Sequence, residues 1–271
     1  MRPLMMAPLP APARPGWLAW TRGHAARLTG ACGIVAVLCA WELLVGLGGV
    51  DPTYLPPPSA VAAVLPGLFL DGPLMADVRA SLSAVLSGTL IACLIALPAT
   101  VAAHLCAPLR WLSAPIVELV RGIAPLALLP AFLLVFGLGT RSTVAIIVWV
   151  AWPPLFINVL AGLDATDRRL IEAARSMGAT TGWLLLTVYM PSVAGHFLAG
   201  LRLALGSAWL AVVAAEMLGA NAGIGFRILE WSQTFHITAM YGAIVVIGVI
   251  SLGLNGVLAW ASAMSTRGQA P

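Results

Sequence analysis

The chain has 271 residues, of which 61% are hydrophobic and 9% are charged, and its mean hydropathy is +0.98. A soluble domain carries roughly 25% charged residues, so this composition excludes a soluble globular protein and predicts an all-α protein embedded in a membrane. The net charge of +4 comes from dispersed arginines, without any lysine. This pattern argues against a nucleic-acid partner, which needs a clustered basic face.

Cysteine and histidine form no recognisable metal site or catalytic group in this sequence. The cysteine spacing matches no metal-binding pattern, and each cysteine lies in or beside an apolar stretch, which indicates small buried side chains. The histidines near the predicted span ends stand alone. The cysteines are Cys32, Cys39, Cys93 and Cys106, and the histidines are His104, His196 and His236. We therefore expect no metal ion, no cofactor and no catalytic residue in this chain.

Residues 1–27 are rich in Pro, Ala and Arg and are predicted to form a cytoplasmic tail. The apolar run that follows is longer than the core of a signal peptide and is not closed by a small-residue cleavage site, so we expect it to remain as a first span. Crossing the bilayer takes about 20 mainly apolar residues. Six stretches qualify, at about 28–48, 84–105, 112–136, 143–163, 193–217 and 239–261.

These spans define a predicted transmembrane domain over 28–262, followed by a cytoplasmic tail over 263–271. Arginines near the span ends are concentrated on one side of the membrane, which the positive-inside rule assigns to the cytoplasm. Both termini are therefore expected inside the cell. The segment 164–191, between the fourth and fifth spans, is expected on the same side.

Two segments on the opposite side are too long for tight turns. The first, 51–83, contains Ser59 as a plausible N-cap for a short helix over 60–65. The second, 219–238, contains glycines that favour a turn. Prolines inside the predicted spans are expected to bend or break the helices. They are Pro98, Pro125, Pro130, Pro153 and Pro154.

The segment 164–191 is polar in an otherwise apolar chain and has the pattern of a helix–turn–helix. Asp164 or Thr166 can cap the first helix. Gly178 is expected to end that helix in the left-handed conformation. An ordered hairpin outside the bilayer predicts a docking partner, because a membrane protein has little other reason to fold one there.

The second helix of this hairpin is expected to begin at a cap provided by Thr180 or Thr181. It carries no basic residue before Met190. Pro191 then marks the return of the chain toward the membrane.

The predicted docking surface contains Glu172, Ala173 and Ala174. Alanine is a strong helix former with almost no bulk, so this surface allows another protein's backbone to approach closely. Glu172 has two interpretations. It can pair with Arg169 or Arg175, each three residues away on the helix, or it can contact basic or backbone groups of a partner.

Four charged residues lie within predicted spans, where charges are costly and usually face water or the interior of a helix bundle. Glu118 and Arg121 are three residues apart and can pair on one face. Arg202 and Glu216 are about 21 Å apart along a helix that rises 1.5 Å per residue, which is too far for pairing. For an anionic substrate, Arg121 or Arg202 is a candidate pathway residue. The alternative for each is structural pairing or contact with the membrane surface.

The sequence Glu172-Ala173-Ala174, with Gly178, Val188 and Pro191 at fixed spacing, resembles the EAA loop of permease subunits of bacterial ATP-binding-cassette importers. The spacing is specific to the importer class. Other stretches resemble the branch of nitrate, sulfonate and taurine permeases, although they are less specific. These stretches lie at 55–59, 125–130, 200–209 and 215–217, and the whole resemblance covers about 55–261.

The resemblance implies a type I importer permease with six transmembrane helices in the bacterial inner membrane. It implies a homodimer of permeases, two cytoplasmic ATPase subunits that bind ATP and Mg, and a periplasmic or lipid-anchored solute-binding protein. The hairpin would be the coupling helix that lies in an ATPase groove. This subunit would be non-catalytic, and without lysine it has no Walker A loop. The implied substrate is a small anion such as an aliphatic sulfonate, taurine or nitrate.

Three positions depart from the pattern of this branch. Met190 stands where leucine usually precedes the closing proline, and residues 181–189 lack the basic side chains that are often present. Ala60 stands where an acidic residue is common. The departures in the hairpin bear on the electrostatics of the ATPase contact.

Other functions are weighed against this one. Within the importer class, the solute could be a pyrimidine precursor or an amino-acid-like compound. A stand-alone ion-driven carrier would need acidic relays inside the membrane, whereas Glu118 is the only deep acid. A membrane-embedded enzyme would need paired carboxylates or a histidine cluster at matching depth, and the sequence has neither.

Overall fold

The computed structural model describes residues 32–267, and the side chains of residues 32–260. Within these residues every regular element is a helix, so the all-α prediction is confirmed. Two short elements, α8 (Thr181–Leu184) and the π-helical turn η1 (Leu185–Tyr189), precede a long helix. The others are α2 (Pro58–Leu70), α3 (Leu74–Leu105), α4 (Ala107–Gly122), α5 (Pro125–Phe136), α6 (Thr140–Asp164), α7 (Arg168–Ser176), α9 (Met190–Gly219), α10 (Ile224–Gln233) and α11 (Ile237–Arg267).

The described residues 32–60 belong to one unit. Its described helix, Cys32–Gly46, is apolar but shorter than the about 20 residues that cross a bilayer. The predicted first span begins outside the described residues, and the predicted tail over 1–27 lies outside them entirely. A first span is therefore not established.

Ser59 does not have the capping role predicted for it. The helix α2 begins one residue earlier, at Pro58. The carboxylate of Glu42 accepts a hydrogen bond of 3.1 Å from the Ser59 N–H and one of 2.7 Å from its hydroxyl. A partner seventeen residues away in the sequence thus replaces the local cap.

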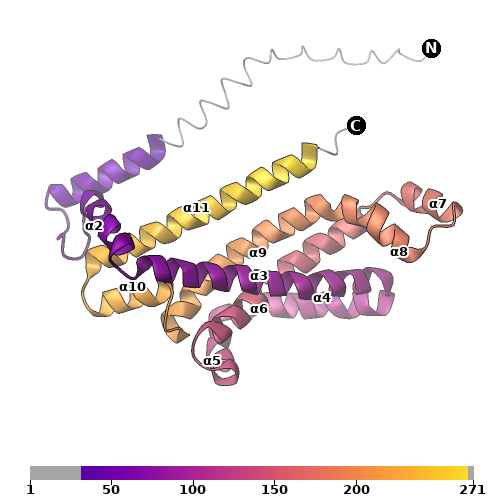
Figure 1. Cartoon of the computed structure of the whole chain (residues 1–271), viewed down its shortest axis with the longest axis horizontal. Helices are drawn as coiled ribbons and strands as arrows, with labels where there is room; N and C mark the ends of the chain where they lie inside the picture. The colour runs from indigo at the N-terminus through magenta and orange to yellow at the C-terminus, as the bar shows by residue number, and fades with distance from the viewer. Residues whose placement is uncertain (1–31, 268–271) are drawn as a thin grey trace, which may run out of the picture. The chain divides into compact units, whose positions relative to one another are not determined.

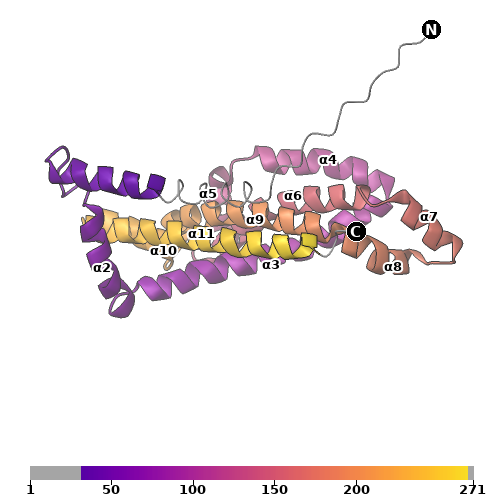
Figure 2. The same cartoon turned by 90° about the horizontal axis from the view of Figure 1, so that it is seen from above.

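The second unit, from Val61 onward, is built on the long helices α3, α6 and α9, which run side by side, with α11 packed against α9 (Figures 1 and 2). The core between them contains Val85, Ile147 and Val212, all fully buried, and Trp209. The outward faces are apolar as well. A helix that is hydrophobic on all sides is typical of a membrane bundle, where lipid covers what neighbouring helices do not.

Small residues let α6 approach both neighbouring helices closely. A Cβ atom added to Gly88 of α3 would lie 2.5 Å from the Ile147 side chain, and one added to Gly200 of α9 would lie 3.0 Å from Asn158. Helices in lipid associate mainly through van der Waals packing, which favours small side chains at such contacts. The three helices therefore form the rigid centre of this unit.

The predicted third span is divided into two helices. α4 ends at Gly122, α5 begins at Pro125, and the two are bent by 96° relative to each other. Residues 123 and 124 are extended. Because the residue before a proline is disfavoured in the helical conformation, Pro125 explains why the helix ends here. The predicted effect of proline is confirmed at this position.

Pro191, predicted to mark the return toward the membrane, lies within a continuous helical stretch. α8, η1 and α9 follow one another without a break and form one apolar helical stretch, Thr181–Gly219. Pro191 lies in the first turn of α9, and the π-helical turn η1 directly before it accommodates the missing N–H within the continuous helix. The second hairpin helix is thus joined directly to a membrane span.

Four stretches are long and apolar enough to cross a membrane: α3, α6, α8 to α9, and α11. The bent pair α4–α5 makes five if it counts as one span. The six predicted spans are therefore established only in part. α3 begins at Leu74 rather than at 84, and α11 runs to Arg267, so residues 263–267 of the predicted C-terminal tail are helical.

Candidate functional site

The predicted hairpin is present, and local capping explains both of its helices. The Asp167 carboxylate caps α7 by accepting a hydrogen bond of 2.9 Å from the Arg169 N–H. Gly178, with φ of +86°, ends α7 in the predicted left-handed conformation. The Thr180 hydroxyl accepts a bond of 3.4 Å from the Trp183 N–H and caps α8.

The two residues predicted to cap α7 have other roles. Asp164 forms a bidentate ion pair with Arg110 at the start of α4, at 2.9 and 2.6 Å. The Thr166 hydroxyl donates a hydrogen bond to the Gly162 carbonyl one helical turn earlier. Asp167 is the acid that remains free for the cap.

The structure divides the Glu172-Ala173-Ala174 triplet between two faces of α7. Glu172 and Ala173 are exposed, whereas Ala174 is buried and packs in a small core with Leu163 and Leu184. Glu172 forms no ion pair with any residue of 32–260, so neither Arg169 nor Arg175 binds its carboxylate. The bare surface of the hairpin thus consists of Ala173 and a free carboxylate.

The base of the hairpin is tied to the ends of α3 and α4. His104, at the end of α3, lies 3.2 Å from the Asp164 carboxylate through its Nδ1, and its ring meets the Tyr189 ring edge-on at 5.1 Å. His104 was predicted to stand alone, and this contact corrects that prediction. A hollow of about 360 Å³ lies between this base and the Glu172 side of α7. The hairpin is therefore held at its root and open along its outer face.

A buried group of polar residues lies at the other end of the bundle, where α10 packs against α3 and α9 (Figure 1). Asp77 and Glu216 are each only 2% exposed. Glu216 accepts hydrogen bonds from the Ser81 hydroxyl at 2.8 Å and from the Gly225 N–H at 3.0 Å. We call Asp77, Ser81, Glu216, Arg227 and Glu230 the α10 polar cluster.

Arg227 provides the positive charge of the α10 polar cluster. Its Nε donates to Asp77 at 2.7 Å, and its Nη1 donates to Glu230. Burial acts to lower the pKa of Arg227, but the hydrogen bond and charge of Asp77, together with Glu230, raise that pKa above its usual value on balance. Asp77 also accepts a bond of 3.0 Å from the Gly223 N–H. The cluster thus fastens the first turn of α10 to two long helices.

The charged residues predicted within the spans have different environments. Arg121 donates to Glu118 over a long 3.4 Å contact, as the three-residue spacing predicted. Arg202 is exposed and forms no ion pair with any residue of 32–260. Glu216 forms no ion pair with Arg121 or Arg202. Its partners Ser81 and Gly225 come from other elements, and no local sequence signal identifies them.

Arg121 lines a cavity of about 560 Å³ at the break between α4 and α5. α6 and α9 also line it, and Ser207 is among the lining residues of α9. A volume of this size is within the range of small-molecule sites. The sequence pattern singled out the arginine but not the cavity, whose lining comes from α4, α5, α6 and α9. Its remaining lining residues are Val120, Ile123, Pro125, Leu126, Trp149, Val150, Pro153, Pro154, Leu203, Leu210 and Ala211.

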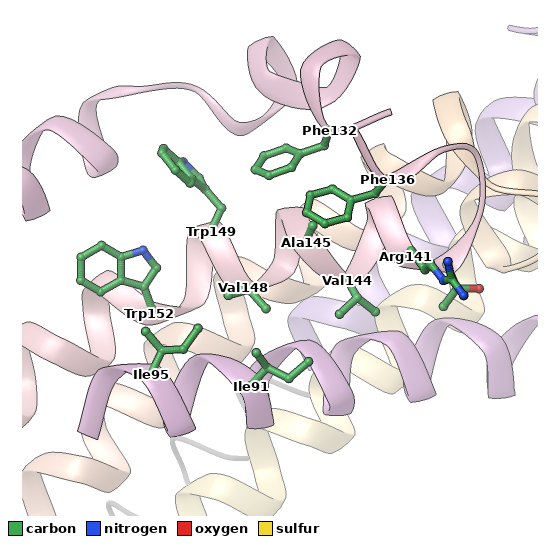
Figure 3. Close-up of a pocket in the computed structure, with 11 residues that line it drawn as sticks. Ile91, Ile95, Phe132, Phe136, Arg141, Val144, Ala145, Val148, Trp149 and Trp152 are labelled. Atoms are coloured by element: carbon green, nitrogen blue, oxygen red, sulfur yellow. The ribbon is translucent and has the colours of Figure 1, made fainter. Parts of the chain in front are cut away.

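A second cavity, of about 620 Å³, lies between α3, α5 and α6 (Figure 3). Apart from Thr140 and Arg141 its lining is hydrophobic, with Ile91 and Ile95 on one side and Phe132 and Phe136 on another. Such a surface suits an apolar chain rather than an ion.

Three tryptophans of the bundle make packing contacts. Trp149 meets the Phe132 ring edge-on at 6.1 Å, and Trp152 meets Phe156 in the same way at 6.0 Å. Trp209 is buried in the main core. Among the described residues, no three His, Cys, Asp or Glu side chains come together as a metal ion would need.

The sequence matches one protein family: the binding-protein-dependent transport system inner membrane component, over residues 88–269. The taurine transport system permease protein TauC of Escherichia coli is 32% identical over 244 residues, which covers 88% of this chain and 89% of that protein. The putative aliphatic sulfonates transport permease protein SsuC of Bacillus subtilis is 28% identical over 214 residues, covering 79% and 78%.

The fold is similar to that of solved transporters. A crystal structure of the MetNI methionine ABC transporter in inward-facing conformations aligns with a TM-score of 0.63 and 20% sequence identity. The alignment covers 73% of this chain and 96% of that chain. At this level of identity the similarity supports the arrangement of the helices.

Proposed function

Because this chain belongs to the family of inner membrane components of binding-protein-dependent transport systems, we propose that it forms the path by which a small sulfonate-type anion enters the cell. The chain is a permease subunit of an ATP-binding-cassette importer. The sulfonate specificity is carried over from its relatives TauC and SsuC, whose names refer to taurine and aliphatic sulfonates. Nitrate is the alternative anion.

The proposed assembly contains two copies of this chain, two cytoplasmic ATPase subunits and a solute-binding protein on the other side of the membrane. ATP and Mg would be bound by the ATPase subunits. Both termini and the hairpin would face the cytoplasm, and the polar cluster at α10 would face outward. ATP-driven closure of the ATPases would move each hairpin and switch the spans between inward- and outward-open states.

The observation that carries this proposal is the way the hairpin is joined to the bundle. α8 continues through η1 into α9, so a push on the hairpin acts directly on a membrane-crossing helix. Asp164 fixes the root of the hairpin to Arg110 of α4. The Glu172 carboxylate and Ala173 are both exposed on α7. A hairpin that is held by an ion pair at its base and exposes a carboxylate beside a small side chain is suited to docking and to transmitting force.

We expect Glu172→Arg and Gly178→Leu each to reduce co-purification with the cognate ATPase by about tenfold or more. The first reverses a charge at the proposed contact, and the second places a side chain in a left-handed turn where a non-glycine residue is strained. A tenfold loss corresponds to about 1.4 kcal/mol, less than the loss of one hot-spot residue in an interface. The measurement is the ATPase-to-permease ratio after affinity purification.

Asp71→Arg is the matched control for this experiment. Asp71 is also an exposed acid, but it lies before α3, at the opposite end of that helix from His104 and the hairpin. Its reversal should leave the ratio unchanged. Unaltered ATPase association in both hairpin variants would contradict the docking role.

We expect Met177→Cys, on the hairpin, to be labelled only from the cytoplasmic side, and Phe235→Cys, after α10, only from the outside. The two side chains are similarly exposed, at 79% and 80%, so accessibility within the protein does not bias the comparison. The test uses a membrane-impermeant maleimide on intact cells and on inverted vesicles, in a chain without its native cysteines. Labelling of Met177→Cys in intact cells would overturn the proposed orientation.

A further inference from the structure

We propose that the cavity at the α4–α5 break binds the substrate during transport, with Arg121 holding the sulfonate-type group and the proline-interrupted wall of α6 holding an amino group of the same molecule. This inference rests on the proposed function and adds the residues of this chain that meet the substrate. It favours an aminoalkanesulfonate, a zwitterion such as taurine, over a simple anion such as nitrate.

The cavity has the size and position that such a site needs. Its volume of about 560 Å³ accommodates a small organic molecule with some water. Four helices contribute to it, α4, α5, α6 and α9, and the first two form the bent pair. Irregular backbone at membrane depth is tolerated where it lines a cavity, because its polar groups need partners that lipid cannot supply.

Arg121 provides the positive charge in this cavity. Its only ion-pair partner among residues 32–260 is Glu118, at 3.4 Å, and both side chains are more than half exposed. A guanidinium group has five N–H donors, so a single long contact leaves most of them available. Arginine within a membrane-spanning segment is costly and usually serves a pathway or a partner. An oxyanion with several acceptor oxygens matches the unused donors.

Ser207 faces the same cavity from α9 and has an unused hydroxyl. Serine and threonine on helices commonly donate to the carbonyl one turn earlier. Thr100 does so to Ala96 at 2.6 Å, and Ser192 does so to Val188 at 2.8 Å. Ser207 makes no hydrogen bond with any residue of 32–260 through its hydroxyl. It is therefore free to donate to a bound ligand.

The α6 wall of the cavity contributes acceptors. Pro153 and Pro154 have no N–H, so the carbonyl oxygens of Trp149 and Val150 lack their ordinary donors four residues later. All four of these residues line the cavity. Donors on Arg121 and Ser207 with acceptors on α6 together match a ligand that carries an anionic group and an ammonium group.

The test places a cysteine at Ser207 and compares two thiol reagents of opposite charge. Ser207→Cys is made in a chain without native cysteines and reconstituted with its ATPase and binding protein in lipid vesicles. In sulfonatoethyl and trimethylammonioethyl methanethiosulfonate, the cysteine thiolate attacks the sulfur that carries the ethyl group, so a disulfide to the alkylthio group forms as the S–SO2 bond breaks and methanesulfinate leaves. We expect the Arg121 charge to raise the rate of modification by the sulfonate reagent about tenfold relative to that by the trimethylammonium reagent. Arg121→Gln should remove this preference.

Two variants control for indirect effects. Arg121→Lys keeps the charge and should keep the preference for the sulfonate reagent. Ser251→Cys lies on α11, in a different small gap beside Trp209, and should show no effect of Arg121→Gln. Taurine should protect Ser207→Cys from modification, ethanesulfonate should protect it less, and nitrate least.

The outcomes separate this inference from the proposed function. If the native assembly imports taurine but Ser207→Cys shows neither charge preference nor protection, the cavity is not the substrate site and this inference fails. If ethanesulfonate protects as well as taurine, the role of the α6 carbonyls is wrong. If the charge preference depends on Arg121 but the assembly imports no sulfonate, the proposed substrate fails while an anion site at Arg121 stands.

Discussion

Replacing Gly223 by alanine is expected to destabilise the permease strongly at the α10 end. Gly223 has φ of +117°, and an added Cβ would lie 2.3 to 2.6 Å from the carboxyl atoms of Glu216. Glu216 is buried and held by Ser81 and the Gly225 N–H, so it has little room to move. Backbone strain and overpacking together cost about 3 kcal/mol.

Thermal unfolding of the purified permease in detergent measures this effect, and the loss should lower the Tm by roughly 5–10 °C. Gly248→Ala is the matched control, because Gly248 lies within α11 and a Cβ there meets no atom within 4 Å. Alanine has the higher helix propensity, so the control should be neutral or slightly stabilising. Equal Tm values for the two variants would show that the Gly223 turn can relax freely.

Asp77→Ala is expected to cost still more, about 3–5 kcal/mol, because it breaks a buried ion pair on one side only. The Asp77 carboxylate accepts from Arg227 at 2.7 Å and from the Gly223 N–H at 3.0 Å. Without it, Arg227 retains Glu230 alone, and a backbone donor at the start of α10 is left unsatisfied. Unfolding temperature and limited proteolysis at α10 measure the loss.

A double-mutant cycle isolates the ion pair within that loss. Arg227→Leu combined with Asp77→Ala should be less destabilising than the sum of the two single changes, since the uncompensated charge is removed. Asp77→Asn keeps an acceptor for the Gly223 N–H and should fall between the native protein and Asp77→Ala. Strict additivity of the two changes would mean that the pair contributes nothing to holding α10.

The two ends of the bundle are linked by the same helices. α9 carries Glu216 at one end and is joined to α8 and the hairpin at the other. α3 carries Asp77 in its first turn and His104 in its last turn. Stability losses at α10 therefore act on helices that also carry the hairpin, whereas Asp71, the control residue of the ATPase experiment, is an exposed acid outside the α10 polar cluster.

Local sequence patterns were sufficient for the features that depend on local physics. The all-α class follows from composition, the end of α7 from Gly178, and the capping of α8 from Thr180 as one of two candidates. Proline positions identified the break before α5. These predictions hold because each depends on backbone conformations or hydrogen bonds within one or two turns of helix.

Contacts between distant residues decided the rest. Asp164 was a reasonable cap, but Arg110, fifty-four residues away, binds it and leaves Asp167 to cap α7. Arg227 and Asp77 are 150 residues apart, and nothing in the local pattern of either one indicates the other. The sequence by itself determined a bilayer protein with a polar helical hairpin, because hydrophobicity and capping are local. Only the tertiary structure decided which charges are paired and where Arg121 meets a cavity, because buried charges take whichever partners the helix packing brings near.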